Sequence, residues 1–203
     1  SIARELDAVV SRREELLKES RAAISLASRS IVKIHTEKMK DAEKDLAQLK
    51  NLLKELRKTA DEDLKRYLIP PETEYVEAAV IKSVATRKTI PRHESLKVSS
   101  EAYLLGLLDS IGELKRMVYD SIRKGDVNRA SDLFNLMETL YIQLSPYAIY
   151  DNVVQGVRRK LDISRRLIED TRAAVTEEVR RAEFMKSMNS LANRLPQKRR
   201  PPG

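Results

Sequence analysis

Apolar side chains recur at intervals of three and four residues along most of this chain, and this spacing limits the fold more than any other feature. Residues three and four apart share one face of an α-helix, so the pattern predicts amphipathic helices. Only five glycines and seven prolines interrupt the 203 residues, which favours long helices over a β-rich domain. The sequence therefore predicts an all-α fold, an antiparallel bundle.

Breaks in the apolar pattern divide the chain into helical segments. Pro71 suits the first position of a helix that stops before Pro91, and Lys124-Gly125-Asp126 favours a helix end followed by a cap. Whether the first two segments join smoothly or turn near Thr36 stays open. The expected helices are 2–36, 37–58, 71–88, 101–123, 127–144 and 147–187, the last as one helix or two in succession. Residues 1–190 are interpreted as one domain, and residues 191–203 as a disordered, basic, Pro-rich tail.

Composition excludes several kinds of site. The chain has no cysteine and only two histidines, His35 and His93, so disulfide and thiolate chemistry are excluded and a zinc site would be hard to build. No phosphate-binding glycine motif is present. No apolar run approaches the roughly 20 residues of a membrane span, and a cytoplasmic protein is the expectation. The net charge of +8 suits a nucleic-acid partner, although a solvated charged surface is the alternative.

Two pairs of acidic residues have a spacing that could support chemistry. Glu74 and Glu77 stand three apart, and Asp109 and Glu113 stand four apart, so each pair shares one helical face. The second pair is the more unusual, because residues 101–123 are apolar around most of the helix and should lie in the middle of the bundle. A buried carboxylate is unfavourable unless it is paired or bound to a metal.

Two interpretations of these acids remain open at this stage. Asp109 could pair with Lys115 or Arg116, or lie on a narrow polar stripe with Asp120. Alternatively, the two helices bring all four carboxylates together. Such a cluster repels itself, and all-oxygen ligation would then favour Mg²⁺ or Mn²⁺. A hard divalent cation beside an RNA phosphate is typical of metal-assisted phosphodiester cleavage.

Three stretches of the chain resemble the translin family, and in particular translin-associated factor X. They are REELLKESRAAISLASRSIVKIH (13–35), PETEYVEAAV (71–80) and EAYLLGLLDSIGELKRMVYDSIRKGD (101–126), of which the last is the most specific. The resemblance implies a bundle of about seven helices, assembly into a hollow octamer, and an acidic endoribonuclease site inside that shell. The family's four acids correspond to Glu74, Glu77, Asp109 and Glu113. The short connector at 89–98 suggests a simpler, prokaryotic-like homo-oligomer.

The first helix carries basic residues that could bind RNA phosphates. Their alternative role is a charged surface paired with Glu14, Glu15 and Glu19. The main functional hypothesis is a metal-dependent endoribonuclease that cuts single-stranded or loosely structured RNA. The alternatives are a translin-like module that binds RNA or single-stranded DNA without cutting it, and a helical scaffold. The candidate RNA-binding residues are Arg12, Arg13, Arg21, Arg29 and Lys33.

Overall fold

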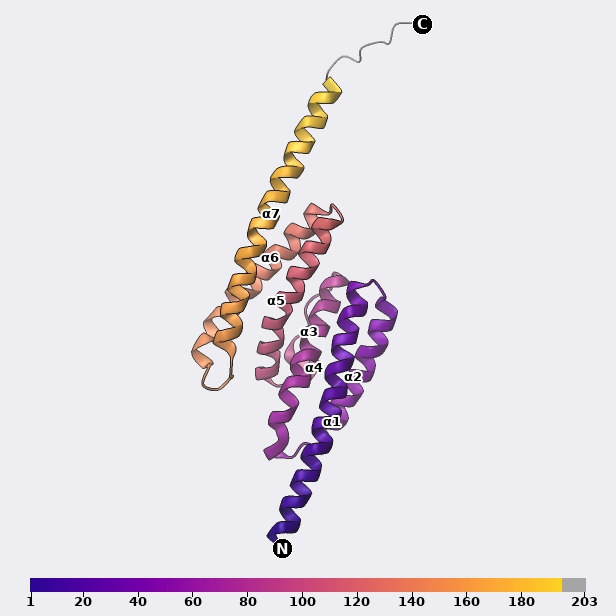
Figure 1. Cartoon of the computed structure of the whole chain (residues 1–203), viewed down its shortest axis with the longest axis vertical. Helices are drawn as coiled ribbons and strands as arrows, with labels where there is room; N and C mark the ends of the chain where they lie inside the picture. The colour runs from indigo at the N-terminus through magenta and orange to yellow at the C-terminus, as the bar shows by residue number, and fades with distance from the viewer. Residues whose placement is uncertain (195–203) are drawn as a thin grey trace.

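The computed structural model describes residues 1–194, and every regular element in that range is a helix (Figure 1). This confirms the predicted all-α class. The first half consists of α1 (Ile2–His35), α2 (Met39–Thr59), the 3₁₀ segment η1 (Glu62–Leu68) and α3 (Ile69–Ala85). The second half consists of α4 (His93–Leu96), α5 (Ser100–Arg123), α6 (Val127–Leu144), the 3₁₀ segment η2 (Ser145–Tyr150) and α7 (Val157–Arg194).

The first two helices are separate and are joined by a tight turn. Glu37 adopts a left-handed conformation with φ of 61°, and the amide of Lys38 donates a hydrogen bond back to the carbonyl of Lys33. This is the Schellman end of a helix, in which glycine is the usual left-handed residue. The turn near Thr36 that the sequence left open is therefore present, with a glutamate in the glycine position.

Other boundaries differ from the predicted ones by a few residues. Helix α3 starts at Ile69, so both prolines lie in its first turn, and it ends at Ala85 rather than at residue 88. The segment that begins at Ser145 is a 3₁₀ helix, and α7 starts only at Val157 and continues to Arg194. Residues 195–203, most of the predicted tail, lie outside the described part of the chain.

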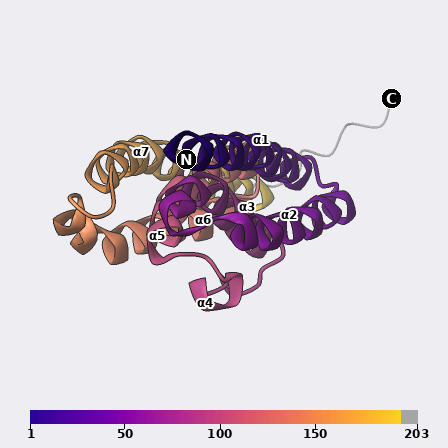
Figure 2. The ribbon, with the colours of Figure 1, turned by 90° about the horizontal axis from the view of Figure 1, so that it is seen from below.

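Helix α5 occupies the centre of the bundle, as its apolar sequence predicted. It packs against α3 on one side and against α6 and α7 on the other, whereas α1 packs against α2 and α3. Figure 2 shows α1 and α7 on one face of the molecule and α4 on the opposite face. The core is aliphatic, and its largest fully buried side chains include Val76, Val80, Ile81, Ile111, Leu114, Val118, Leu133 and Met137.

Two buried acids hold helices together. Asp45 on α2 accepts hydrogen bonds from Arg29 and Lys33 on α1, at 2.8 and 2.6 Å. The hydrogen bond from Arg29 is the main reason that the pKa of Asp45 is lowered to about 2. Glu72 accepts from Arg57 on α2 at 2.7 Å and from the backbone amide of Ser99 at the start of α5. Each of these carboxylates thus has its charge matched within the fold.

The ends of α1 and α7 extend beyond the bundle in opposite directions (Figure 1). Both ends expose large apolar side chains, although neither is a membrane span: no helix within residues 1–194 is long and apolar enough to cross a bilayer. The exposed apolar residues are Ile2, Leu6 and Val10 on α1, and Phe184, Met185, Met188 and Leu191 on α7.

Candidate acidic site between α3 and α5

Helices α3 and α5 are in close contact at Gly106. A Cβ atom placed on Gly106 would lie 2.6 Å from the carbonyl oxygen of Thr73 and 2.6 Å from the Cβ of Val76. Real Cβ atoms do not approach other atoms so closely, so only glycine allows the two helices to pack at this distance. Glu77 follows Val76 directly, and Asp109 lies one turn beyond Gly106. The contact therefore brings acids of the two helices together.

All four predicted carboxylates lie within electrostatic reach of one another and are half-buried. Burial raises the pKa of Glu77 to about 8, and the negative charges of the other three carboxylates add to this effect. Burial also raises the pKa of Glu74, again with a contribution from Asp109. The site therefore has an excess of negative charge in a partly desolvated position.

The two acids of α5 are bound by residues from two different flanking helices. Asp109 pairs with the ammonium of Lys160 on α7. The Oε2 atom of Glu113 lies 2.5 Å from Nε2 of His35, at the end of α1, and this hydrogen bond is the main reason that the pKa of Glu113 is lowered. The His35 side chain is only 4% exposed. Side chains from α1 and α7 therefore contact the two acids of α5.

The pairing that local spacing suggested for Asp109 does not occur. Lys115 instead binds Asp170 on α7 at 3.2 Å, and Arg116 lies 3.9 Å from Glu113. Glu74 and Glu77 have no hydrogen-bonding or ion-pair partner among residues 1–194, and their pKa values are raised by burial and by the neighbouring carboxylates. This distinguishes them from Glu72 on the same helix, which is fully matched.

The donor set suits a hard divalent cation, although its geometry is not that of a formed metal site. Four carboxylates offer only oxygen ligands, and a cation would relieve their mutual repulsion. Within residues 1–194, however, no three His, Cys, Asp or Glu side chains stand in an arrangement that could hold a metal ion. Asp109 and Glu113 are turned toward Lys160 and His35 and would have to reorient to join Glu74 and Glu77.

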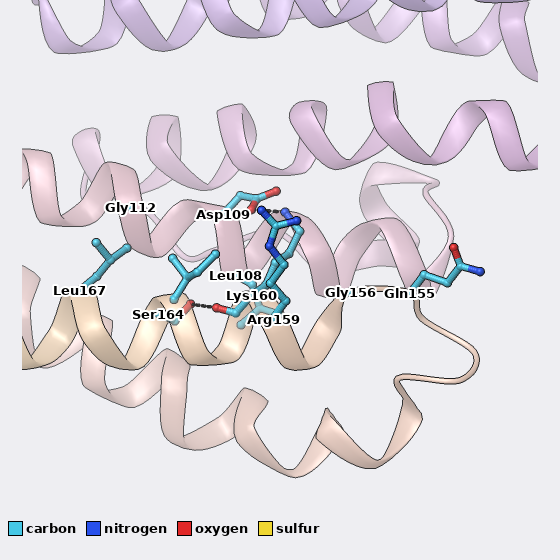
Figure 3. A pocket seen from close by; sticks show the side chains of 10 residues that line it. Leu108, Asp109, Gly112, Gln155, Gly156, Arg159, Lys160, Ser164 and Leu167 are labelled. Atoms are coloured by element: carbon cyan, nitrogen blue, oxygen red, sulfur yellow. Dashed lines mark hydrogen bonds and ion pairs between the residues drawn. The ribbon is translucent and has the colours of Figure 1, made fainter.

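A groove of about 490 Å³ runs beside Asp109 along the start of α7 (Figure 3). The side chains of Arg159 and Lys160 point from α7 toward Asp109, and Gln155 lies just before the first residue of α7. Leu108, Ile163 and Leu167 form its apolar wall. The groove therefore places cationic side chains and apolar surface directly next to Asp109.

The basic residues predicted on α1 lie mostly in contacts that stabilise the fold. Arg12 pairs with Asp61 at 3.1 Å, and Arg13 donates to the hydroxyl of Tyr67 at 2.8 Å. Arg29 and Lys33 bind Asp45 rather than the glutamates of their own helix. Arg21 is exposed. The structure does not bring these five residues into the acidic site.

Sequence reasoning missed the residues of α1 and α7 that contact the acids. His35 was considered only as one of two histidines, too few to make a zinc site, and its partner 78 residues away could not be known. Lys160 and Arg159 belong to a helix whose basic residues gave no local signal.

Comparison with known sequences gives the family. The sequence profile of the Translin family matches residues 5–175. The chain belongs to the Translin family. An uncharacterised protein of Methanocaldococcus jannaschii is 36% identical to it over 162 residues, which cover 78% of this chain and 72% of that protein.

Solved structures show the same fold as this Translin-family chain. The crystal structure of AfC3PO is 29% identical and matches with a TM-score of 0.78, over 87% of this chain and 94% of that chain. The complex of AfC3PO with duplex RNA matches with a TM-score of 0.76 at the same identity and coverage. Apo-NeC3PO, 24% identical, matches with a TM-score of 0.77 over 87% of this chain and 95% of that chain.

Replacing Gly106 with alanine should separate α3 from α5 in this Translin-family chain. Because the new Cβ has no room, Gly106→Ala should lower the free energy of unfolding by about 1–3 kcal/mol. Gly112→Ala is the matched control on the same helix, since its Cβ would meet only Leu167 Cδ1 at 3.9 Å. The control should be neutral or more stable by up to about 1 kcal/mol. Urea denaturation of both variants checks this, and equal stability would contradict the close contact.

Stability should depend on pH through Glu77. Its pKa is about 8 in the fold against 4.5 for an ordinary glutamate. Between these values the folded protein holds a proton that the unfolded chain has released, so the free energy of unfolding falls as the pH rises from about 4.5 to 8. In metal-free buffer, Glu77→Gln should flatten this dependence and raise stability at pH 8. The exposed Glu177→Gln serves as control, and the same slope in both variants would contradict the assignment.

Proposed function

We propose that this protein is a divalent-metal-dependent endoribonuclease that cuts single-stranded or loosely structured RNA, with Mg²⁺ or Mn²⁺ as cofactor. The observation that carries the proposal is the convergence of four half-buried carboxylates from α3 and α5. Glu74 and Glu77 have no partner within residues 1–194, and burial, together with the negative charges of Glu74, Asp109 and Glu113, raises the pKa of Glu77 to about 8. Repulsion between carboxylates does not stabilise a fold, whereas a cation site requires carboxylates that lie close together.

Family membership and the structural matches support RNA as the substrate class. The complex of AfC3PO with duplex RNA is 29% identical to this chain over 87% of its length. Basic residues beside the acids could contact an RNA backbone, because Arg159 and Lys160 of α7 line the groove next to Asp109. We propose a cytoplasmic location for this activity.

Each residue of the site has a defined role in the proposed reaction. Glu74, Glu77, Asp109 and Glu113 would hold the cation. The ion supplies Lewis acidity toward the phosphodiester and makes water a better nucleophile at neutral pH. His35 binds the Glu113 carboxylate from a buried position and keeps it ionised, and the carboxylate would turn from His35 toward the cation. The close contact at Gly106 sets the distance between the acids of the two helices.

A second candidate is RNA or single-stranded DNA binding without cleavage. The observation that favours it is the engagement of Asp109 and Glu113 by Lys160 and His35, which leaves no ready-made ligand set within residues 1–194. Incubation of labelled single-stranded RNA with the protein, with Mg²⁺ and with excess chelator, separates the two. Cutting that requires the metal supports the nuclease, and binding without cutting supports the alternative.

Asp109→Asn should abolish metal-dependent cleavage while it leaves chelator-insensitive RNA binding and folding intact. The substitution keeps the side-chain shape and removes the negative charge that a cation requires. Asp170→Asn is the matched control, because Asp170 also pairs with a lysine across the α5–α7 boundary but lies apart from the site. The nuclease assignment fails if Asp109→Asn cuts RNA at the wild-type rate.

We further propose that the protein assembles into a closed homo-oligomer, with eight copies as the expected number. The ends of α1 and α7 expose a large apolar surface that the bundle of one chain does not cover. Light scattering at micromolar concentration should give a mass near eight times 23.3 kDa. Replacing Phe184 and Leu191 with serine should reduce that mass, because the exposed apolar surface of α7 is lost. A monomeric wild-type protein would overturn the proposal.

A further inference from the structure

We infer that Lys160 is an internal counter-ion, which holds Asp109 in the metal-free protein and moves to an RNA phosphate when a divalent cation takes its place. In this arrangement Lys160 and Arg159 together bind the RNA backbone in the groove beside the acids. The inference rests on the proposed function and adds two positioning residues and a substrate subsite to it.

The ammonium of Lys160 already lies where a cation would be needed. It forms an ion pair with Asp109, and both side chains are partly buried, at 32% and 26% exposure. Its positive charge also acts on Glu74 and Glu77, where it offsets part of the rise in pKa that burial causes. One side chain from α7 therefore partly neutralises carboxylates from both α3 and α5. A bound divalent cation would do the same with a larger charge.

Lys160 can leave this position without disturbing the fold. A lysine ammonium is a point charge on a flexible four-carbon stem, and it gives no fixed, bidentate contact. A divalent cation on Asp109 would repel it. The released Lys160 side chain can extend into the groove next to Asp109, because Lys160 is one of the residues that line this groove (Figure 3).

The groove has the chemistry of a phosphate subsite. Arg159 points into it and has no acidic partner among residues 1–194, and Gln155 adds an amide at one end. Arg158, Arg159 and Lys160 all lie in the first turn of α7, where the helix dipole disfavours cations. These three cations therefore destabilise the start of α7, and an anionic ligand in the groove would offset that unfavourable interaction. Arginine and lysine near RNA mostly contact phosphate oxygens.

Metal affinity in the absence of RNA tests the counter-ion role. Calorimetric titration with Mn²⁺ should show tighter binding to Lys160→Met than to the wild type, on the order of tenfold, since a competing cation is gone. Lys115→Met is the matched control: Lys115 also bridges α5 and α7, but to the exposed Asp170. Its Mn²⁺ affinity should stay at the wild-type value. Circular dichroism confirms that both variants are folded.

RNA affinity in excess chelator tests the subsite. Arg159→Gln should weaken binding of single-stranded RNA and reduce the dependence of log affinity on log salt by about one unit. Arg158→Gln is the control, because the Arg158 guanidinium donates to the carbonyl of Ala148 and does not line the groove. Equal RNA affinity and salt dependence in the wild type and Arg159→Gln would remove the groove from the RNA path.

The outcomes separate this inference from the proposed function. If the wild type binds no Mn²⁺, the nuclease proposal fails, and the counter-ion role fails with it. If the wild type binds Mn²⁺ at a site that Asp109→Asn loses, but Lys160→Met binds with unchanged affinity, only the counter-ion role is wrong. Tighter binding by Lys160→Met and Lys115→Met alike would show a general charge effect and would also overturn it.

Discussion

The contact between α3 and α5 at Gly106 is the feature on which the candidate site depends. Two helices with ordinary side chains at their crossing lie about 8–10 Å apart, with the side chains between them. Here the glycine brings its backbone against Thr73 and Val76, and a methyl group would not fit. Glu77 follows Val76 directly, and Asp109 lies one helical turn after Gly106. The packing that stabilises the core therefore also sets how strongly the acids of the two helices repel one another.

The buried and half-buried acids of the fold differ in whether they have a cationic partner. Asp45 and Glu72 are buried, and each has a cationic partner at hydrogen-bonding distance, so their charges tie α1 to α2 and α2 to α3. The acids of the site are only half-buried, and two of the four have no partner within residues 1–194. Asp109 and Glu113 have theirs from α7 and α1, at opposite sides of the site. Incomplete pairing of this kind is expected where a ligand completes the charge balance.

Much of the fold could be predicted from periodicity, because an apolar face repeats over many turns and each helix needs it for burial. The four acids were predictable as two pairs, since spacing on one helix is a local property. Their partners were not: His35 and Lys160 reach the acids across 78 and 51 residues, which only the tertiary fold determines. The turn after α1 could not be decided from the sequence, because glutamate, at Glu37, occupies a left-handed position where glycine is usual. The basic residues of α1 looked free because Asp45 and Asp61, on other segments, were not recognised as their partners.

We propose that the carboxylates of α3 and α5 together bind a divalent cation. Diffraction from crystals soaked in Mn²⁺, recorded near the manganese absorption edge, tests it most directly. We expect one anomalous peak or more between α3 and α5, within coordination distance of Asp109 and of at least one of Glu74 and Glu77, with the Lys160 ammonium turned away from Asp109. Mn²⁺ bound elsewhere on the protein, with Lys160 still paired to Asp109, would contradict the account.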